Sequence, residues 1–129
     1  MKIGLGAVQF GLDYGISNQE GKTKAEEVVK ILDVAEKEGI RIIDTAALYG
    51  RSEEVLGQSL RRNHPFNIVT KTITVSKPHV TQEDAQRLED LFFQSLKKMK
   101  QSSVYGLLIH HADDLLTENG YLLMEKMLE

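Results

Sequence analysis

The feature that most constrains the fold of this chain is a repeated alternation of short apolar runs with longer segments of helical periodicity. The apolar runs have the length of strands and lie at residues 3–8, 40–43, 66–70 and 104–109. Helical periodicity follows at about residues 23–39, 52–62, 81–99 and 117–128. Strands that alternate with helices in this way build a parallel sheet with right-handed crossovers. The pattern therefore predicts an α/β fold of the parallel (β/α)-barrel type, with four βα units in a single domain over residues 1–129.

Capping residues place the predicted ends of the helices. Thr23, with Glu26 three residues later, has the pattern of a capping box, and Gly39 stands where a helix C-terminus is expected. Thr81 and Thr117 are predicted to begin the third and fourth helices. These positions support the helices independently of their apolar periodicity.

Ionisable side chains stand at three of the four predicted strand ends. Asp44 follows the second apolar run, and Lys71 follows the third. His110 and His111 follow the fourth, and Tyr49 lies in the loop after Asp44. Neighbouring parallel strands are about 4.8 Å apart, so side chains at their ends can converge on one substrate.

Such a group suits hydride transfer to a carbonyl, because that reaction needs a proton donor at the oxygen. A phenol can donate the proton, and a nearby ammonium favours the phenolate that remains. A carboxylate can hold the ammonium in place, while an imidazole polarises and orients the carbonyl oxygen. The residue types at the strand ends therefore indicate carbonyl reduction.

Each of these residues also has a purely structural interpretation. Asp44 would fit a turn or a helix cap, and Lys71 could extend its ammonium to solvent. His110 and His111 are adjacent, so only one of them can face inward, and the spacing does not choose between them. With Asp113 they could suggest a metal site, but the sequence offers no convincing third ligand for zinc catalysis, and no metal is predicted.

The stretch around Asp44 resembles the second strand, loop and helix of the aldo-keto reductases. The resemblance is carried by Asp44-Thr45-Ala46, Tyr49-Gly50 and Ser52-Glu53, and the opening IGLGAVQFG fits the same family. It implies a catalytic tetrad of Asp44, Tyr49, Lys71 and His110, with Tyr49 as the general acid. It also implies a substrate that is an aldehyde, ketone or sugar carbonyl.

The resemblance further implies NADPH or NADH as the cofactor. In the family, Gly6, Ala7 and Val8 of this sequence occupy the stretch that passes under the nicotinamide ribose, and Asp44 lies beside it. Residues 11–18 would overhang the site, where Asp13 and Tyr14 are candidates for shaping substrate choice.

The resemblance covers the N-terminal half of the family's barrel. The chain has 129 residues, whereas a (β/α)8 barrel typically needs about 250. Barrel phosphate sites lie after strands seven and eight, and no GxGxxG fingerprint replaces them here. We therefore expect the isolated chain to be an incomplete reductase. Two alternatives stay open: a non-catalytic half-barrel that oligomerises, and a barrel lyase that forms a Schiff base on Lys71.

Composition narrows the possible partners and location. The chain has 16 basic and 19 acidic residues without a basic run, which argues against nucleic acid or an anionic membrane as a partner. It has no cysteine, which excludes disulfides and cysteine nucleophiles. The N-terminal apolar stretch is too short for a signal peptide, so a cytoplasmic location is expected.

Four open strands also predict self-association. An unclosed parallel sheet leaves two edges unpaired and its inner face bare. If about six to eight apolar side chains face inward, exposing them forgoes on the order of 10–20 kcal/mol. The sequence therefore predicts a homodimer or a larger homo-oligomer that covers this face.

Overall fold

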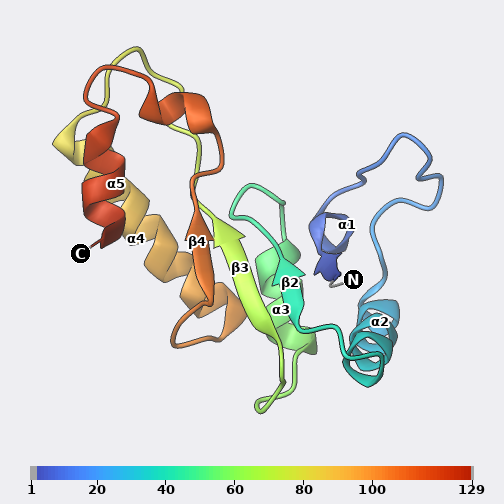
Figure 1. The fold of residues 1–129 in the computed structure, drawn as a ribbon. Coiled ribbons are helices and arrows are strands. Elements are labelled where there is room, and N and C mark those ends of the chain that lie inside the picture. Colours follow the sequence, from blue (N-terminus) through green and yellow to red (C-terminus); the bar gives the residue numbers. More distant parts are fainter. Residues whose placement is uncertain (1–2, 129) are drawn as a thin grey trace.

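The computed structural model describes residues 3–128 and shows four parallel strands that alternate with helices (Figure 1). The elements in chain order are β1 (Gly4–Gly6), α1 (Val8–Gly11), α2 (Ala25–Lys37), β2 (Ile42–Asp44), α3 (Ser52–Ser59), β3 (Asn67–Lys71), α4 (Gln82–Met99), β4 (Gly106–Leu108), the 3-10 helix η1 (Ala112–Leu115) and α5 (Tyr121–Leu128). The strands pair in the order β1-β2-β3-β4, and every pairing is parallel. The predicted α/β half-barrel is therefore confirmed.

Strand register separates the two faces of the sheet. Leu5, Ile43 and Ile68 lie in one row and belong to the core between the sheet and the helices. The buried members of this core are Ala7, Phe10, Val28, Leu32, Ala35, Ile43, Leu56 and Phe66. Its side chains come from β1, β2, α1, α2 and α3, so it fixes the first half of the chain.

A second, smaller core forms above the sheet around Val80, Leu88 and Leu123. It lies between α4, α5 and the two loops that follow β3 and β4, which run side by side in Figure 1. Asp114 joins these loops, because its carboxylate accepts the backbone N–H groups of Val75 and Ser76 at 2.9 and 3.0 Å. The two loops therefore form one supported unit at the C-terminal end of the strands.

Two of the predicted helix ends are confirmed, and two are wrong. Gly39 follows α2 with φ +74°, and Thr81 begins α4 with a complete capping box. Thr23 forms no cap, because Lys24 is the N-cap residue of α2 and makes no side-chain hydrogen bond. Thr117 does not begin the last helix, which starts at Tyr121; its hydroxyl instead donates to the carbonyl of Asp114 at 2.8 Å.

The segment predicted as the end of the first strand folds differently. Val8 belongs to α1 and not to a strand, and α1 interrupts the stretch predicted as loop from residue 9. The helix predicted over residues 52–62 ends at Ser59, since Leu60 takes an extended conformation with ψ 135°. Within residues 3–128, no helix is both long and apolar enough to cross a membrane.

The open face of the sheet carries fewer apolar side chains than predicted. A Cβ on Gly4 would lie 3.3 Å from Cγ2 of Ile42, and one on Gly106 would lie 3.5 Å from Cγ2 of Val69. Both glycines therefore lie on the face of Ile42 and Val69, opposite the helices. Within the strands, the apolar side chains of this face are Ile42, Val69 and Leu108. The estimate of six to eight was too high because glycines occupy the alternating positions of the outer strands.

Candidate active site

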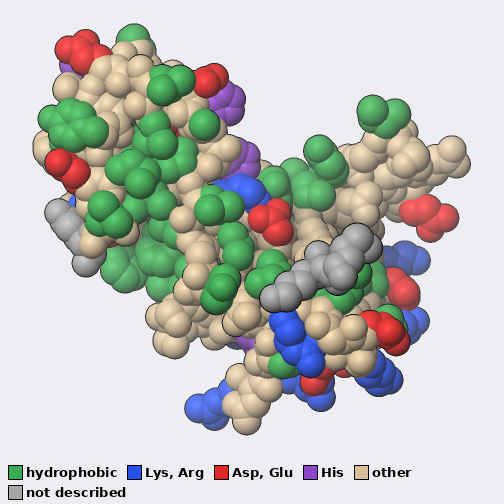
Figure 2. Space-filling model, in the orientation of Figure 1, with side chains coloured by type: hydrophobic (Ala, Val, Ile, Leu, Met, Phe, Trp, Pro, Cys, Tyr) green, Lys and Arg blue, Asp and Glu red, His purple; other side chains and the backbone are tan. Residues whose placement is uncertain are grey.

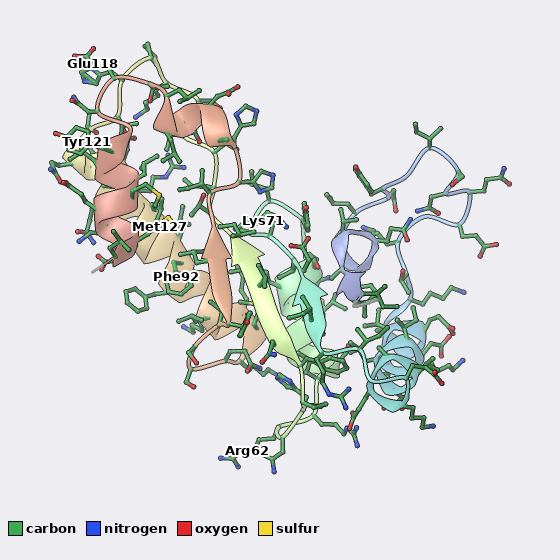
Figure 3. All side chains as sticks on the ribbon, viewed as in Figure 1. Arg62, Lys71, Phe92, Glu118, Tyr121 and Met127 are labelled. Atoms are coloured by element: carbon green, nitrogen blue, oxygen red, sulfur yellow. The ribbon has the colours of Figure 1, made fainter. Side chains whose placement is uncertain are left out.

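Asp44 and Lys71 form an ion pair at the C-terminal end of the sheet. Asp44 ends β2, Lys71 ends the neighbouring β3, and Figure 3 shows Lys71 where these strands meet their loops. The Lys71 Nζ lies 2.7 Å from both carboxylate oxygens and 3.0 Å from the carbonyl oxygen of Thr45. These three acceptors use all three ammonium hydrogens. The ammonium is therefore held in a fixed place, with its side chain only 16 % exposed.

Tyr49 lies above this ion pair, in the loop between β2 and α3. The Lys71 Nζ is 4.9 Å from the centre of the Tyr49 ring, a distance at which an ammonium is attracted to the aromatic face. Among residues 3–128, none forms a hydrogen bond with the Tyr49 hydroxyl. The lysine thus supports the ring, and the hydroxyl is available to a ligand.

His110 follows β4 and completes the group. Its ring meets the Tyr49 ring edge to face, with centroids 5.9 Å apart and planes at 77°. Its backbone N–H donates to the Thr72 hydroxyl at 3.1 Å. His111 points elsewhere: it is exposed, and its Nδ1 lies 3.7 Å from Asp113. The structure therefore brings His110, and not His111, to Tyr49.

The environment of His110 favours its neutral form. Burial lowers its pKa from the ordinary value, the positive charge of Lys71 and His111 lowers it further, and Asp44 opposes them. Its Nδ1 is buried without a hydrogen-bond partner among the described residues. An imidazole with Nδ1 deprotonated carries its hydrogen on Nε2, from which it can donate to a substrate oxygen.

A buried carboxylate beside β3 was not predicted as a site residue. Glu53, in the first turn of α3, is 2 % exposed and accepts the Thr70 hydroxyl at 2.8 Å. Its second oxygen is buried and has no partner among residues 3–128. The neighbouring Glu54 lies at the surface and pairs with Arg51. Glu53 is part of the family resemblance, but only the contact of α3 with Thr70 in β3 shows that its carboxylate is buried and bonded.

The proposed cofactor-contacting residues differ in what they present. A Cβ on Gly6 would meet nothing within 4 Å, so open space lies over this end of β1, beside Asp44 in the register. Ala7 has no exposed surface, and its amide donates to the Asp44 carbonyl at 2.9 Å. Val8 is half-buried in α1. Gly6 and Asp44 therefore offer the accessible part of this site.

Asp13 and Tyr14, in the loop expected to overhang the site, have different surroundings. Asp13 accepts the backbone N–H of Lys22 at 2.7 Å, so it braces the loop, while Tyr14 is exposed. The part of the chain that the structure describes holds no cluster of three His, Cys, Asp or Glu side chains suited to a metal ion.

A carboxylate, an ammonium, a phenol and an imidazole thus meet at the C-terminal end of a parallel sheet in a (β/α) scaffold. The sequence profile described as "Aldo/keto reductase family" matches residues 2–129. This chain belongs to the aldo-keto reductase family.

Solved structures agree with this assignment. PA4992 from Pseudomonas aeruginosa, assigned to the aldo-keto reductases, is 31% identical with a TM-score of 0.74, and the match covers 97% of this chain and 49% of that one. A second Pseudomonas structure of this class is 28% identical with a TM-score of 0.71, covering 96% and 48% of the two chains. The holo form of the aldo-keto reductase AKR11C1 from Bacillus halodurans shares the fold at 21% identity and a TM-score of 0.62, over 96% and 41%.

The chain thus spans about half the length of the two Pseudomonas structures it matches. A comparison with curated protein sequences gave no match.

Proposed function

We propose that this chain carries the acid–base part of an NAD(P)H-dependent carbonyl reductase site. The observation that supports the proposal best is the chain of contacts among four side chains: Lys71 is held by Asp44, and its ammonium lies under the ring of Tyr49, which meets His110. The nicotinamide, when bound, supplies a hydride to the carbonyl carbon of the substrate. The side chains of this chain then have to stabilise the negative charge on the carbonyl oxygen and supply a proton to it.

Each side chain has a distinct part in that chemistry. Tyr49 donates its hydroxyl proton to the oxygen as negative charge develops there. The Lys71 ammonium stabilises the resulting phenolate through its charge, and Asp44 keeps the ammonium in position. His110, neutral because burial lowers its pKa, donates from Nε2 to the carbonyl oxygen and orients it. The product is the alcohol, with one hydride on carbon and one proton on oxygen.

The ion pair disfavours the Schiff-base alternative. A lysine that attacks a carbonyl must be a neutral amine with a free lone pair. The Lys71 nitrogen instead donates to two carboxylate oxygens and one backbone carbonyl, which are contacts of an ammonium. We therefore assign Lys71 an electrostatic part and not a covalent one.

A chimera tests the proposed reaction. The chain would be joined to the second half of the Pseudomonas protein PA4992, of which it matches 49%. NADPH-dependent reduction of a panel of aldehydes would then be compared between the chimera and its Tyr49→Phe variant. We expect about a 10²–10⁴-fold loss of kcat with NADPH affinity unchanged, since the phenol acts in the chemical step.

Tyr105→Phe is the matched control for that experiment. Tyr105 is an exposed phenol that precedes β4, at the end of the strand opposite His110. Its removal should leave the rate unchanged. Turnover by the Tyr49→Phe chimera at the level of the Tyr105→Phe chimera would refute the assigned role of Tyr49.

We further propose that the isolated chain binds NADPH weakly. The accessible contacts lie at Gly6 and Asp44, beside the expected nicotinamide, and barrel phosphate sites are built by later strands. Calorimetric titration of the 129-residue chain measures this affinity. A dissociation constant in the low micromolar range or tighter would contradict the proposal.

The two sheet edges support a proposal on assembly. Beside β1, an apolar groove of about 280 Å³ is lined by Leu5, Ile31, Val34, Ala35 and Ile40, together with charged side chains. Beside β4, Figure 2 shows apolar side chains gathered over α4 and α5, and Phe93, Met124 and Leu128 are exposed there. The free edges of β1 and β4 belong to one parallel sheet, so a two-fold pair of copies can join them at both seams.

We propose that the 129-residue chain forms this homodimer. The chain has no cysteine, so one engineered pair of cysteines can test whether the β1 edge of one copy lies beside the β4 edge of the other. With Val34→Cys and Met124→Cys in one chain, oxidation should link two copies. Asp33→Cys with Met124→Cys should not, because Asp33 is on another face of α2 and lines a different groove. A folded monomer by analytical ultracentrifugation at micromolar concentration would contradict the proposal.

A further inference from the structure

Gly11 and Gly50 pack at backbone distance in the contact between α1 and the loop that carries Tyr49. Gly11 ends α1 and is buried against the loop that carries Tyr49. A Cβ on Gly11 would lie closer than 3.0 Å to the carbonyl oxygen of Tyr49 and to the backbone nitrogen of Ser52, and side chains essentially never approach so closely. The atoms in the way belong to the backbone, so no side-chain rotation relieves the overlap.

A side chain on the loop side of this contact, at Gly50, would overlap with α1 in the same way. Gly50 has φ +57°, and a Cβ there would lie 2.6 Å from the carbonyl oxygen of Gly11 and 2.8 Å from Cδ2 of Leu12. A side chain on Gly50 would therefore meet Gly11, and a side chain on Gly11 would meet the backbone on both sides of Gly50. The end of α1 and the Tyr49–Gly50 peptide are seated against each other at backbone distance.

Hydroxyl groups fix the ends of the same loop. The Ser52 hydroxyl donates to the Ala7 carbonyl at 2.7 Å and lies 2.9 Å from the hydroxyl of Thr45. All three residues are fully buried. Residues 45–52 therefore leave β2 and enter α3 at two points joined to each other and to the end of β1. Between these points, the loop packs against α1 at Gly11.

We infer that Gly11 is a positioning residue for Tyr49. The absence of a Cβ lets α1 sit directly on the Tyr49 peptide, and this sets the ring 4.9 Å above the Lys71 ammonium and 5.9 Å from the His110 ring. A side chain at position 11 pushes the loop away from α1 and carries the phenol with it. The consequence for catalysis rests on the proposed function, whereas the placement of the ring does not.

Gly57 supplies a matched control for the test. Gly57 lies in α3, the helix that follows the Tyr49 loop. A Cβ there would come closer than 3.0 Å to the carbonyl oxygen of Lys98. Gly57→Ala therefore creates a backbone overlap of the same kind between α3 and α4, at the other end of α3. Both substitutions should destabilise the protein, but only Gly11→Ala should move Tyr49.

The main readout is the NMR shift of the His110 ring hydrogens in the 129-residue chain. The edge-to-face Tyr49 ring imposes a ring-current shift on them, and Tyr49→Leu gives the value without it. We expect the His110 resonances of Gly11→Ala to move toward those of Tyr49→Leu, and those of Gly57→Ala to stay at the wild-type value. Unchanged resonances in a folded Gly11→Ala protein, or equal movement in both variants, would overturn the inference.

Two further measurements complete the test. If Gly11→Ala does not fold, Gly50→Ala presses on the same contact from the loop side, because its Cβ lies 2.6 Å from the Gly11 carbonyl oxygen, and unchanged His110 resonances in that variant would also overturn the inference. In the chimera with PA4992, Gly11→Ala should lower kcat by about 100-fold at unchanged NADPH affinity, as a displacement of about 1 Å does elsewhere. A shifted His110 resonance with an unchanged kcat would contradict the proposed function and leave the positioning intact.

Discussion

Asp114 gives the sharpest stability prediction, because one buried carboxylate holds two loops together. Its two oxygens each accept one backbone N–H, from Val75 and Ser76, and its side chain is almost fully buried. A hydrogen bond to a charged group contributes about 1.5–3 kcal/mol. Asp114→Ala should therefore lower the free energy of unfolding by about 3–6 kcal/mol, a large part of the about 5–15 kcal/mol of an ordinary domain.

Asp114→Asn separates the two bonds. The amide keeps one acceptor oxygen and turns an NH₂ group toward the other backbone N–H, so one bond survives and one contact becomes repulsive. We expect a loss of about half that of Asp114→Ala or somewhat more. Asp113→Ala is the control, since the neighbouring carboxylate is 78 % exposed and should change stability by no more than about 0.5 kcal/mol.

Urea unfolding followed by circular dichroism measures these differences, and hydrogen exchange localises them. The amides of Val75 and Ser76 should lose protection in Asp114→Ala beyond the loss expected from global stability. If Asp114→Ala costs less than about 1 kcal/mol, or no more than Asp113→Ala, the two hydrogen bonds do not hold the loops and the reasoning fails.

Three further predictions follow from single contacts. The folded-state pKa of His110 lies below its unfolded value, so the unfolded state binds more protons and stability should fall as the pH drops below about 6.5; His110→Gln should reduce this slope in urea titrations at several pH values, and an identical slope would contradict the argument. Thr70→Val should cost about 1–3 kcal/mol because it leaves the Glu53 carboxylate without its partner, whereas Thr70→Ser should retain most of the stability; equal unfolding midpoints would refute this. Gly39→Ala should lower the free energy of unfolding by about 1–2 kcal/mol, because alanine is strained at φ +74° although no atom blocks its Cβ. A thermal unfolding midpoint equal to that of the wild type would contradict this conformational cost.

The sequence predicted the sheet well because its signals there are local and repeated. Apolar runs, Gly39 and Thr81 each act within a few residues, and the structure places β2, β3, β4 and α4 where they indicate. The helix α1 was missed because it has only four residues: Val8 continues the apolar run of β1 and was predicted as strand, and the residues after it were predicted as loop. Thr23 failed as a cap because a pattern of residue types does not fix the turn at which a helix begins.

The candidate site was predictable in its residue types and not in its contacts. Parallel strands end at one edge, which is why Asp44 and Lys71 could be expected to meet. The approach of the ammonium to the face of Tyr49, and not to its oxygen, depends on the height of the loop above the sheet. That height is set by the packing of Gly11 against the Tyr49 peptide, and these two residues are distant in sequence. The catalytic parts of these residues stay predictions.

The order of strands in the sheet bears on how the protein forms during its synthesis. Each strand pairs only with strands next to it in sequence, so every new βα unit can dock on the edge left by the one before it. Asp44 emerges from the ribosome first and has no cation until β3 brings Lys71, and His110 arrives last with β4. We therefore expect the Asp44 carboxylate to be charged and unpaired at the edge of the sheet until β3 pairs with β2. The sequence order of Asp44, Lys71 and His110 is therefore also the order in which the site is assembled.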